Sequence, residues 1–388
     1  MSASAQLPLP RTHQYGSTPV AKTDYGDASL QIGPQVSVIV PAYNAAATLE
    51  QAVRSVMRQT RPDLEIIVVD DASSDATWDV AQRLQLLDDR IRIERLARNG
   101  GKSFVMNHAT GLARGKWIAL LDADDWYAPD RLERLIDAAE AAGADMVADN
   151  LAFVDSHAKL CSGTGFPERG ARRAVDLDAF LAMSNPTARY DYGMLQPIFR
   201  ADFIRRHDIS YYQPARIGED FYQLLCFFAA GGRAIVLDTP LYYYVEPFGA
   251  ISRRWAQPSR SRYRFESMLE THRHFASLLA ERLSPRQQSL LRRREAGITA
   301  MILLHQTHEC VRKGDIRGAF HRASHAPARL WLIISRKLAS RLRASLFPPQ
   351  GSPVPDPTYL APSHALRQRR AAGLAALFVR QGLPGVGT

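Results

Sequence analysis

Three carboxylates stand close together at Asp122, Asp124 and Asp125, directly after an apolar run at residues 117–121. Such a run is typical of a buried parallel strand, and open α/β sheets bind ligands at the carboxyl ends of these strands. Neighbouring carboxylates repel one another unless a cation offsets their charge. Because carboxylate oxygens are hard ligands, the motif predicts magnesium or manganese carrying a phosphorylated substrate. Taken alone, an Asp-X-Asp pattern is more often a solvated loop after a core strand.

Two further acidic clusters support the chemical interpretation. Asp70 and Asp71 follow a second apolar run at residues 65–69, so their side chains can reach the same sheet edge as Asp122. Glu219 and Asp220 open a strongly apolar helix predicted at residues 221–230. Acids in a first turn also suit the positive end of a helix dipole, so the second pair has a structural interpretation as well.

The elements that carry these acids alternate between strand and helix. Strands are predicted at residues 36–40, 65–69, 91–96, 117–121 and 145–148. Helices are predicted between them, with Thr48 as the cap of the first and Pro129 at the start of the last. This alternation predicts a doubly wound α/β sheet.

The second half of the sheet region is less regular in sequence. Residues 153–184 contain several Gly and Pro and predict a long substrate-facing loop. Residues 234–237 and 241–245 predict two strands that flank a turn at Pro240. The aromatic residues 242–244 are expected to pack within their strand.

Several motifs resemble those of family 2 glycosyltransferases, in the same order and at similar spacing. They are Val-Ser-Val-Ile-Val-Pro-Ala-Tyr-Asn at 36–44, residues 65–75, Asp-Ala-Asp at 122–124 with Pro-Asp-Arg-Leu at 129–132, and Gly-Glu-Asp at 218–220. The resemblance covers roughly residues 36–245 and implies a GT-A fold, a Rossmann-like mixed sheet. It also implies an inverting, sugar-nucleotide-dependent enzyme of the kind that builds bacterial exopolysaccharides such as succinoglycan.

The resemblance implies a donor site made of five residues. Pro41 and Tyr43 match the loop that contacts the nucleotide, and Asp71 matches the residue that reads a uracil ring. Asp122 and Asp124 match the Asp-X-Asp pair, which handles the ribose and the metal bound to the diphosphate. The expected co-substrate is a UDP-sugar, with Mn²⁺ or Mg²⁺ held by Asp124 and Asp122.

The resemblance also implies a catalytic base. Asp220 matches it, and Glu219 stands beside it as the alternative. A carboxylate is needed because an acceptor hydroxyl is a poor nucleophile until its proton is removed. Lys102 and Arg98 lie where basic residues can touch the nucleotide, although a hinge in the loop explains that segment nearly as well.

The chain departs from the processive synthases of this family. No Gln-X-X-Arg-Trp motif follows the Glu-Asp pair, and residues 253–255 (Arg-Arg-Trp) match it only in part. We therefore expect one sugar to be added per encounter, on a saccharide or lipid-linked saccharide acceptor.

Composition and charge indicate where such an enzyme would work. Three widely spaced cysteines fit a reducing cytosol, and no stretch reaches the roughly 20 apolar residues of a membrane-spanning helix. The formal charge of +10 comes largely from an Arg-rich C-terminal region, with an amphipathic pattern at residues 329–347. We expect a cytoplasmic protein that can rest on the inner face of the plasma membrane through this basic helix, or the same helix packed on the domain. Nucleic-acid binding is not expected.

Four segments are predicted along the chain. They are a flexible tail at 1–34, a GT-A domain at 35–250, a basic, mainly α-helical extension at 255–347, and a Pro-rich linker with a C-terminal tail at 348–388.

Two other functions stay open at this point. A nucleotidyltransferase on a related sheet would release pyrophosphate, although its usual Gly-rich, basic first loop is missing here. A catalytically inactive, membrane-associated assembly partner would not need the four acids Asp71, Asp122, Asp124 and Asp220.

Overall fold

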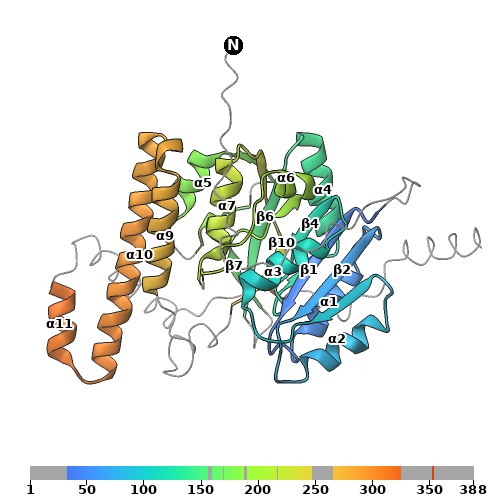
Figure 1. Ribbon diagram of the computed structural model, residues 1–388, viewed down its shortest axis with the longest axis horizontal. Coiled ribbons are helices and arrows are strands. Elements are labelled where there is room, and N and C mark those ends of the chain that lie inside the picture. The colour runs from blue at the N-terminus through green and yellow to red at the C-terminus, as the bar shows by residue number, and fades with distance from the viewer. Residues whose placement is uncertain are drawn as a thin grey trace, which may run out of the picture.

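One mixed sheet forms the centre of the computed structural model, which describes residues 33–155, 160–168, 170–187, 190–215, 217–246, 265–324 and 352–353 (Figure 1). Its main strand order is β11-β7-β6-β9-β4-β1-β2-β3, and β10 pairs with β5, β6 and β8 beside this path. The strands on the main path are β1 (Val36–Ala42), β2 (Leu64–Asp70), β3 (Ile91–Arg95), β4 (Trp117–Leu120), β6 (Met146–Asp155), β7 (Leu160–Thr164), β9 (Ile198–Arg200) and β11 (Ser352–Pro353).

The first half of the sheet is parallel, as the alternating pattern predicts. β1 lies between β2 and β4 and is parallel to both, and β2 is parallel to β3. The connecting helices are α1 (Leu49–Met57), α2 (Thr77–Gln85), α3 (Lys102–Leu112) and α4 (Arg131–Ala142). Every residue of β2 is buried because helices cover both faces of the sheet.

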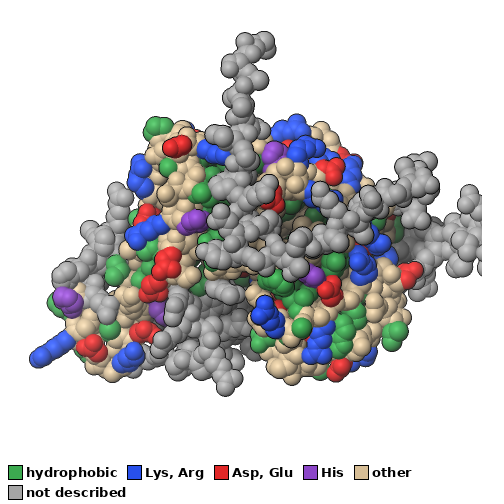
Figure 2. Space-filling view, in the orientation of Figure 1, with side chains coloured by type: hydrophobic (Ala, Val, Ile, Leu, Met, Phe, Trp, Pro, Cys, Tyr) green, Lys and Arg blue, Asp and Glu red, His purple; other side chains and the backbone are tan. Residues whose placement is uncertain are grey.

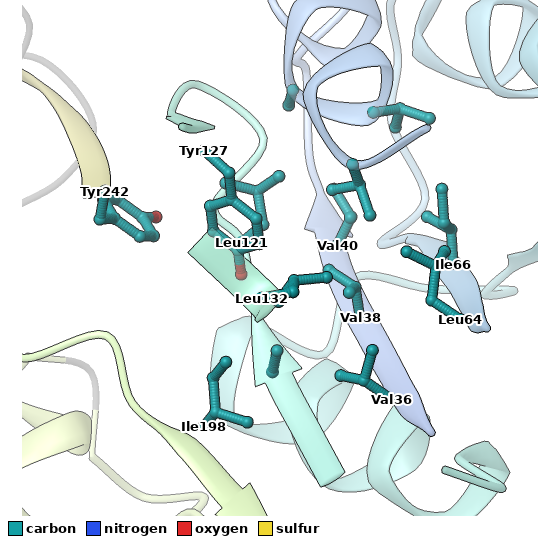
Figure 3. Close-up of a cluster of buried hydrophobic side chains, with 14 of the residues drawn as sticks. Val36, Val38, Val40, Leu64, Ile66, Leu121, Tyr127, Leu132, Ile198 and Tyr242 are labelled. Atoms are coloured by element: carbon teal, nitrogen blue, oxygen red, sulfur yellow. The ribbon is translucent and has the colours of Figure 1, made fainter. Parts of the chain in front are cut away.

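Alternate residues of β1 pack on opposite faces of the sheet. Val36, Val38 and Val40 join a cluster with Leu132 of α4 and Tyr242 of β10 (Figure 3). On the other face, Ile39 packs with Val105 and Met106 of α3 in a separate cluster. The sheet is thus fixed on both sides by apolar contacts, which holds the carboxyl ends of β1, β2 and β4 at one edge.

The prediction for the start of α1 was correct in position and wrong in detail. Thr48 precedes Leu49, the first residue of α1, but its side chain accepts no capping hydrogen bond. Its hydroxyl instead donates to the carbonyl of Ala45 at 3.4 Å. Ala45 in turn is held by the hydroxyl of Thr77, so the loop before α1 is fixed from the neighbouring βα unit.

The prediction of a long loop at residues 153–184 was wrong. β6 extends to Asp155, and β7, β8 (Arg172–Val175) and α5 (Leu177–Met183) occupy much of the segment. These strands are short, and β8 pairs with β10, about 60 residues further along the chain, so local periodicity could not reveal them. Asn150 also fixes the segment, because its amide donates to the carbonyls of Phe166 and Asp238.

The two strands predicted around Pro240 are one strand, β10 (Ala234–Glu246). It runs parallel to β6, and the pairing register shifts on both sides of Pro240. A proline lacks the backbone N–H needed for a regular ladder, and the irregularity accommodates it without ending the strand. β10 also pairs with the two-residue β5 (Trp126–Tyr127), which directly follows the acidic turn.

Helices of the C-terminal region confirm the predicted α-helical extension. They are α9 (Phe265–Leu278), η2 (Ala280–Arg282), α10 (Pro285–Arg312) and α11 (Ile316–Ser324). In Figure 1, α9 and α10 lie beside α5 and α7 (Glu219–Ala229), on the side of the molecule away from α1 and α2. Phe275, Leu279 and Leu291 share one buried cluster with Phe221 and Leu225 of α7.

A buried arginine strengthens this contact. Arg294 of α10 stands over the ring of Phe221, with its guanidinium carbon 3.6 Å from the ring centroid. Its nearest carboxylate is Asp191, at 3.6 Å. Asp191 precedes the short helix η1 (Tyr192–Met194) and accepts a hydrogen bond from Gly193 at 2.6 Å. The remaining helix, α6 (Ala201–Arg206), follows β9.

The expectations about the ends of the chain fall mostly outside the described residues. This applies to nearly all of the tail at 1–34, to the amphipathic pattern at 329–347 and to most of 348–388. Within the described ranges, no helix has the length and apolar character needed to cross a bilayer. On the face in Figure 2, Lys and Arg side chains are interspersed with Asp and Glu instead of forming one basic patch.

A fully buried ion pair connects the sheet to α4. Arg131 and Asp149 are both 0% exposed, and the guanidinium donates to Asp149 Oδ1 at 2.7 Å. Arg131 also donates to the carbonyl of Gln196 at 2.6 Å and lies over the rings of Tyr127 and Tyr242. Burial raises the pKa of Asp149 above its ordinary value, and Arg131 acts against this shift.

Replacing Arg131 with Leu should therefore destabilise the protein strongly. The substitution leaves Asp149 buried without its cation, at a cost of about 3–5 kcal/mol in the free energy of unfolding. Arg54→Ala removes the half-buried partner of the exposed Glu50 on α1 and should cost less than about 0.5 kcal/mol. Urea unfolding of the two variants checks the difference, and equal losses would contradict the importance of the buried pair.

Candidate active site

The acidic turn after β4 is fixed by its third carboxylate. Asp125 is 2% exposed and accepts hydrogen bonds from the Tyr242 hydroxyl at 2.7 Å and the Val245 backbone N–H at 2.8 Å. The same hydroxyl accepts a hydrogen bond from the Asp122 backbone N–H at 3.2 Å. Burial, together with the charges of Asp124 and Asp122, raises the pKa of Asp125 well above its ordinary value. Asp125 thus orients the turn, because the neighbouring strand β10 holds it.

The other two acids of the turn remain accessible to a ligand. Asp124 is exposed and the Asp122 side chain is 21% exposed. Among the described residues, no group of three His, Cys, Asp or Glu side chains is arranged to hold a metal. A pair of carboxylates is nevertheless the set that suits Mg²⁺ or Mn²⁺ when substrate phosphates and water supply the remaining oxygens. The residues present therefore fit a metal that arrives with a phosphorylated substrate.

Asp71 lies at the end of β2 and holds the loop before α3. Its carboxylate accepts hydrogen bonds from the backbone N–H groups of Gly100 at 2.7 Å and Gly101 at 2.9 Å. Asn99 donates to the Asp71 carbonyl at 3.2 Å. A carboxylate has about four acceptor positions, so its oxygens can accept from a further donor. Its predicted contact with a uracil ring stays a prediction.

The loop after β1 lies against the loop after β2. Asn44 donates from its backbone to the Ser73 hydroxyl at 2.9 Å, and its side chain accepts from Ser74 at 2.9 Å. Tyr43 precedes this contact and is 55% exposed, so its ring is available to stack on a ligand. Pro41 lies within β1 itself, one residue before the end of the strand.

Lys102 joins the acidic turn to α7. Its ammonium group lies 3.1 Å from Asp122 Oδ1 and 3.6 Å from Asp220 Oδ2. Burial lowers the pKa of Lys102, but Asp122 and Asp220 raise it, and the resulting pKa is well above the ordinary value. Lys102 is therefore a permanent cation between two carboxylates that lie far apart in the sequence.

Backbone geometry brings Asp220 to this cation. Gly218 precedes α7 with a φ of 74°, a left-handed conformation that glycine adopts without strain. A Cβ at this position would stand 3.2 Å from the terminal methyl of Met268 in α9. The turn therefore lies closely against the C-terminal helices, and α7 begins with Asp220 directed toward Lys102 of α3.

Burial raises the pKa of Asp220 to about 7. Lys102 acts against this shift, while the charges of Glu219 and Asp122 add to it, and the hydroxyl of Tyr211 lowers the pKa by hydrogen bonding. A carboxylate with a pKa near the working pH is well suited to general base catalysis.

The structure thus brings Lys102, Asp122 and Asp220 into one cluster, with Glu219 next to Asp220 in sequence. Arg98 is exposed in the loop before α3, and its contact with a nucleotide stays a prediction. Sequence reasoning missed Tyr211, which is buried and fixed by two hydrogen bonds of 2.8 Å between its backbone and the Asn107 side chain. Neither Tyr211 nor Asn107 belongs to a recognisable motif, so only the folded arrangement reveals them.

Comparison with known proteins agrees with these observations. The model of the glycosyl transferase family 2 domain matches residues 37–183. The succinoglycan biosynthesis protein ExoU of Rhizobium meliloti is 30% identical over 325 residues, which cover 82% of this chain and 91% of that protein. The chain belongs to glycosyltransferase family 2. The family and the GT-A fold predicted from the motifs are thereby confirmed, and the protein is a glycosyltransferase.

Two other similarities are weaker in coverage or in fit. The succinoglycan biosynthesis protein ExoO of Rhizobium meliloti is 37% identical over 222 residues, and the chain spans 63% of its length. A crystal structure of Staphylococcus aureus TarS 1-349 in complex with UDP-GlcNAc is 18% identical, with 74% of this chain and 89% of that chain covered and a TM-score of 0.49. The family 2 domain match ends at residue 183, so Asp220 and the C-terminal helices lie beyond it.

The pKa of Asp220 predicts how activity depends on pH. If Asp220 is the base, kcat/KM should rise as the pH increases through about 7, because only the ionised carboxylate accepts a proton. Rates measured from pH 5.5 to 9 with a glycosyl acceptor would show this rise in kcat/KM. A kcat/KM that stays constant over this range, as a base with the ordinary carboxyl pKa of 3.8 would give, would contradict the assignment.

The raised pKa of Asp220 also makes the stability of the folded protein depend on pH. A raised carboxyl pKa means that ionisation costs folded stability, and this cost grows from the ordinary value of 3.8 up to about 7 and stays constant above it. Asp220→Asn should therefore raise Tm more at pH 8 than at pH 5, while it abolishes activity. Glu219→Gln is the matched control for removal of a neighbouring acid.

Proposed function

We propose that this family 2 glycosyltransferase moves a sugar from a UDP-sugar to a hydroxyl of a saccharide or lipid-linked saccharide, with inversion at the anomeric carbon. The observation that carries the proposal is the cluster of Asp122, Lys102 and Asp220 at the carboxyl edge of the sheet. It combines a diphosphate-binding cation with a carboxylate of raised pKa. The surface or exopolysaccharide context is supported by the names of the relatives ExoU and ExoO.

The donor would lie along the loops at the ends of β1, β2 and β4. We assign the nucleobase to Tyr43, Pro41 and Asp71, where an exposed ring and a carboxylate with further acceptor capacity lie on adjoining loops. Asp122 and Asp124 would hold a divalent cation together with the donor diphosphate. When bound, this cation supplies Lewis-acid stabilisation of the charge on the departing diphosphate.

Asp220 would act on the acceptor. As the acceptor oxygen forms its bond to the anomeric carbon, the bond from that carbon to the UDP oxygen breaks and Asp220 takes the hydroxyl proton. Lys102 is placed to attract the developing negative charge on UDP. Attack by the acceptor on the face opposite the leaving group inverts the anomeric centre, so an α-linked donor gives a β-linked product.

A screen of UDP-sugars with Mn²⁺ or Mg²⁺ and saccharide or lipid-linked acceptors should show release of UDP. Asp124→Ala should lower the rate about 100-fold or more, in the range for loss of one group that stabilises transition-state charge. Asp137→Ala, which removes an exposed carboxylate on α4 that pairs with Arg61, is the matched control and should keep full activity.

The products separate this proposal from its alternatives. Release of pyrophosphate from a sugar phosphate and UTP would indicate a nucleotidyltransferase. Metal-dependent UDP affinity is not required of an inactive assembly partner. No UDP release across a broad panel, and no difference between the native protein and Asp124→Ala, would overturn the proposal.

We further propose that the protein works in the cytoplasm at an anionic membrane surface, through the basic amphipathic pattern at residues 329–347. Full-length protein should co-sediment with vesicles that contain anionic lipid and not with purely zwitterionic vesicles. Replacing Arg336, Lys337 and Arg341 together with Gln should weaken this binding. Unchanged binding would show that these residues do not attach the protein to the membrane.

A further inference from the structure

Lys102 occupies an unfavourable position for a cation. It is the first residue of α3, and the first turn of that helix contains no acid. The exposed N–H groups of a helix start give this end a positive potential, so a lysine here is disfavoured locally. A residue that contradicts local preference points to a function elsewhere in the fold. In this case its partners are Asp122 and Asp220, from two distant elements.

The two oxygens of Asp220 have different surroundings. Oδ1 is buried and has no hydrogen-bond partner in the described part of the chain. The side chain as a whole is 22% exposed, so its accessible surface lies on its other atoms. Among these only Oδ2 can accept a proton, and Oδ2 is the oxygen that Lys102 faces at 3.6 Å. An acceptor hydroxyl therefore meets Lys102 at the one oxygen able to act as base.

Both partners of Lys102 have another role in the proposed reaction: Asp122 as a metal ligand and Asp220 as the base. Asp122 would share the divalent cation that arrives with the donor, and the donor diphosphate would offer Lys102 an anion of higher charge. A lysine side chain is a flexible stem with a compact charge, and the Lys102 side chain is 29% exposed, so its ammonium can move. Movement toward the diphosphate would take the cation away from Oδ2 of Asp220.

We propose that Lys102 is a positioning residue that covers the base Asp220 until a nucleoside diphosphate donor draws its ammonium group away. This inference rests on the proposed function. It makes binding ordered, with donor before acceptor, because the acceptor hydroxyl finds a free base only in the donor complex. It also means that the ion pair between Lys102 and Asp220 competes with donor binding.

A double-mutant cycle on UDP affinity tests this competition without any measurement of catalysis. Isothermal titration of UDP with Mg²⁺ at pH 8 uses the full chain, Asp220→Asn, Lys102→Met and the double variant. Asp220→Asn should tighten UDP binding roughly two- to fivefold in the native background, because a part-exposed ion pair no longer holds Lys102. The same substitution in the Lys102→Met background should change the affinity by clearly less.

The control for general electrostatics is Glu219→Gln. This change removes a neighbouring acid for which no ion pair with Lys102 is found among the described residues. The charge of Glu219 also acts on Lys102, but after those of Asp122 and Asp220. The cycle built on Glu219 should therefore show a smaller interaction energy than the cycle built on Asp220. Thermal unfolding of each variant confirms that the affinities refer to folded protein.

The possible outcomes lead to different conclusions. A tightening by Asp220→Asn that depends on Lys102 supports the inference. Equal effects of Asp220→Asn with and without the Lys102→Met change, or weaker UDP binding in Asp220→Asn, would overturn it and leave the proposed function intact. Absence of UDP binding by the unaltered protein would contradict the proposed UDP-sugar donor, and the inference would fail with it.

Discussion

The buried pair of Arg131 and Asp149 joins several elements behind the acidic turn. It joins the start of α4 to β6, receives the backbone N–H of Leu241 from β10 at 3.0 Å, and holds the approach to β9 through the Gln196 carbonyl. Tyr242 lies against the same guanidinium and extends to the acidic turn through its hydroxyl. Because a buried charge needs its partner, these elements cannot separate without a large penalty. The carboxylates of the turn are therefore held in place by an interaction remote from the proposed substrate contacts.

The parallel half of the fold could be predicted from sequence because its strands are short apolar runs between helices of regular period. The later half could not, because β8 and β9 are defined by partners far away in the chain, and β7 is a short strand with little periodicity of its own. Pro240 is the clearest case. Locally it signals a turn, while in the fold β10 continues past it by shifting register against β6.

For the acids of the site, too, sequence could predict one part and only the fold shows the other. Asp71, Asp122, Asp124 and Asp220 stand at strand ends or a helix start, where motif and position agree, so sequence could single them out. Their separate roles needed the folded arrangement. Asp125 is chemically identical to Asp122 and Asp124, yet it is buried, bonded to Tyr242, and orients the turn. Tyr211 carried no signal, because its contribution depends on α3 and α7 meeting in space.

Gly218 lies close to Met268, and Arg294 lies over the ring of Phe221. These contacts limit which segments can be exchanged between related enzymes. The helix that carries Asp220 shares its hydrophobic core with α9 and α10, so the C-terminal helices are part of the scaffold of the site and not a detachable module. A chimera joined between β10 and α9 would pair two halves of one core that were not selected together. An exchange of α7 between relatives should therefore transfer α9 and α10 with it.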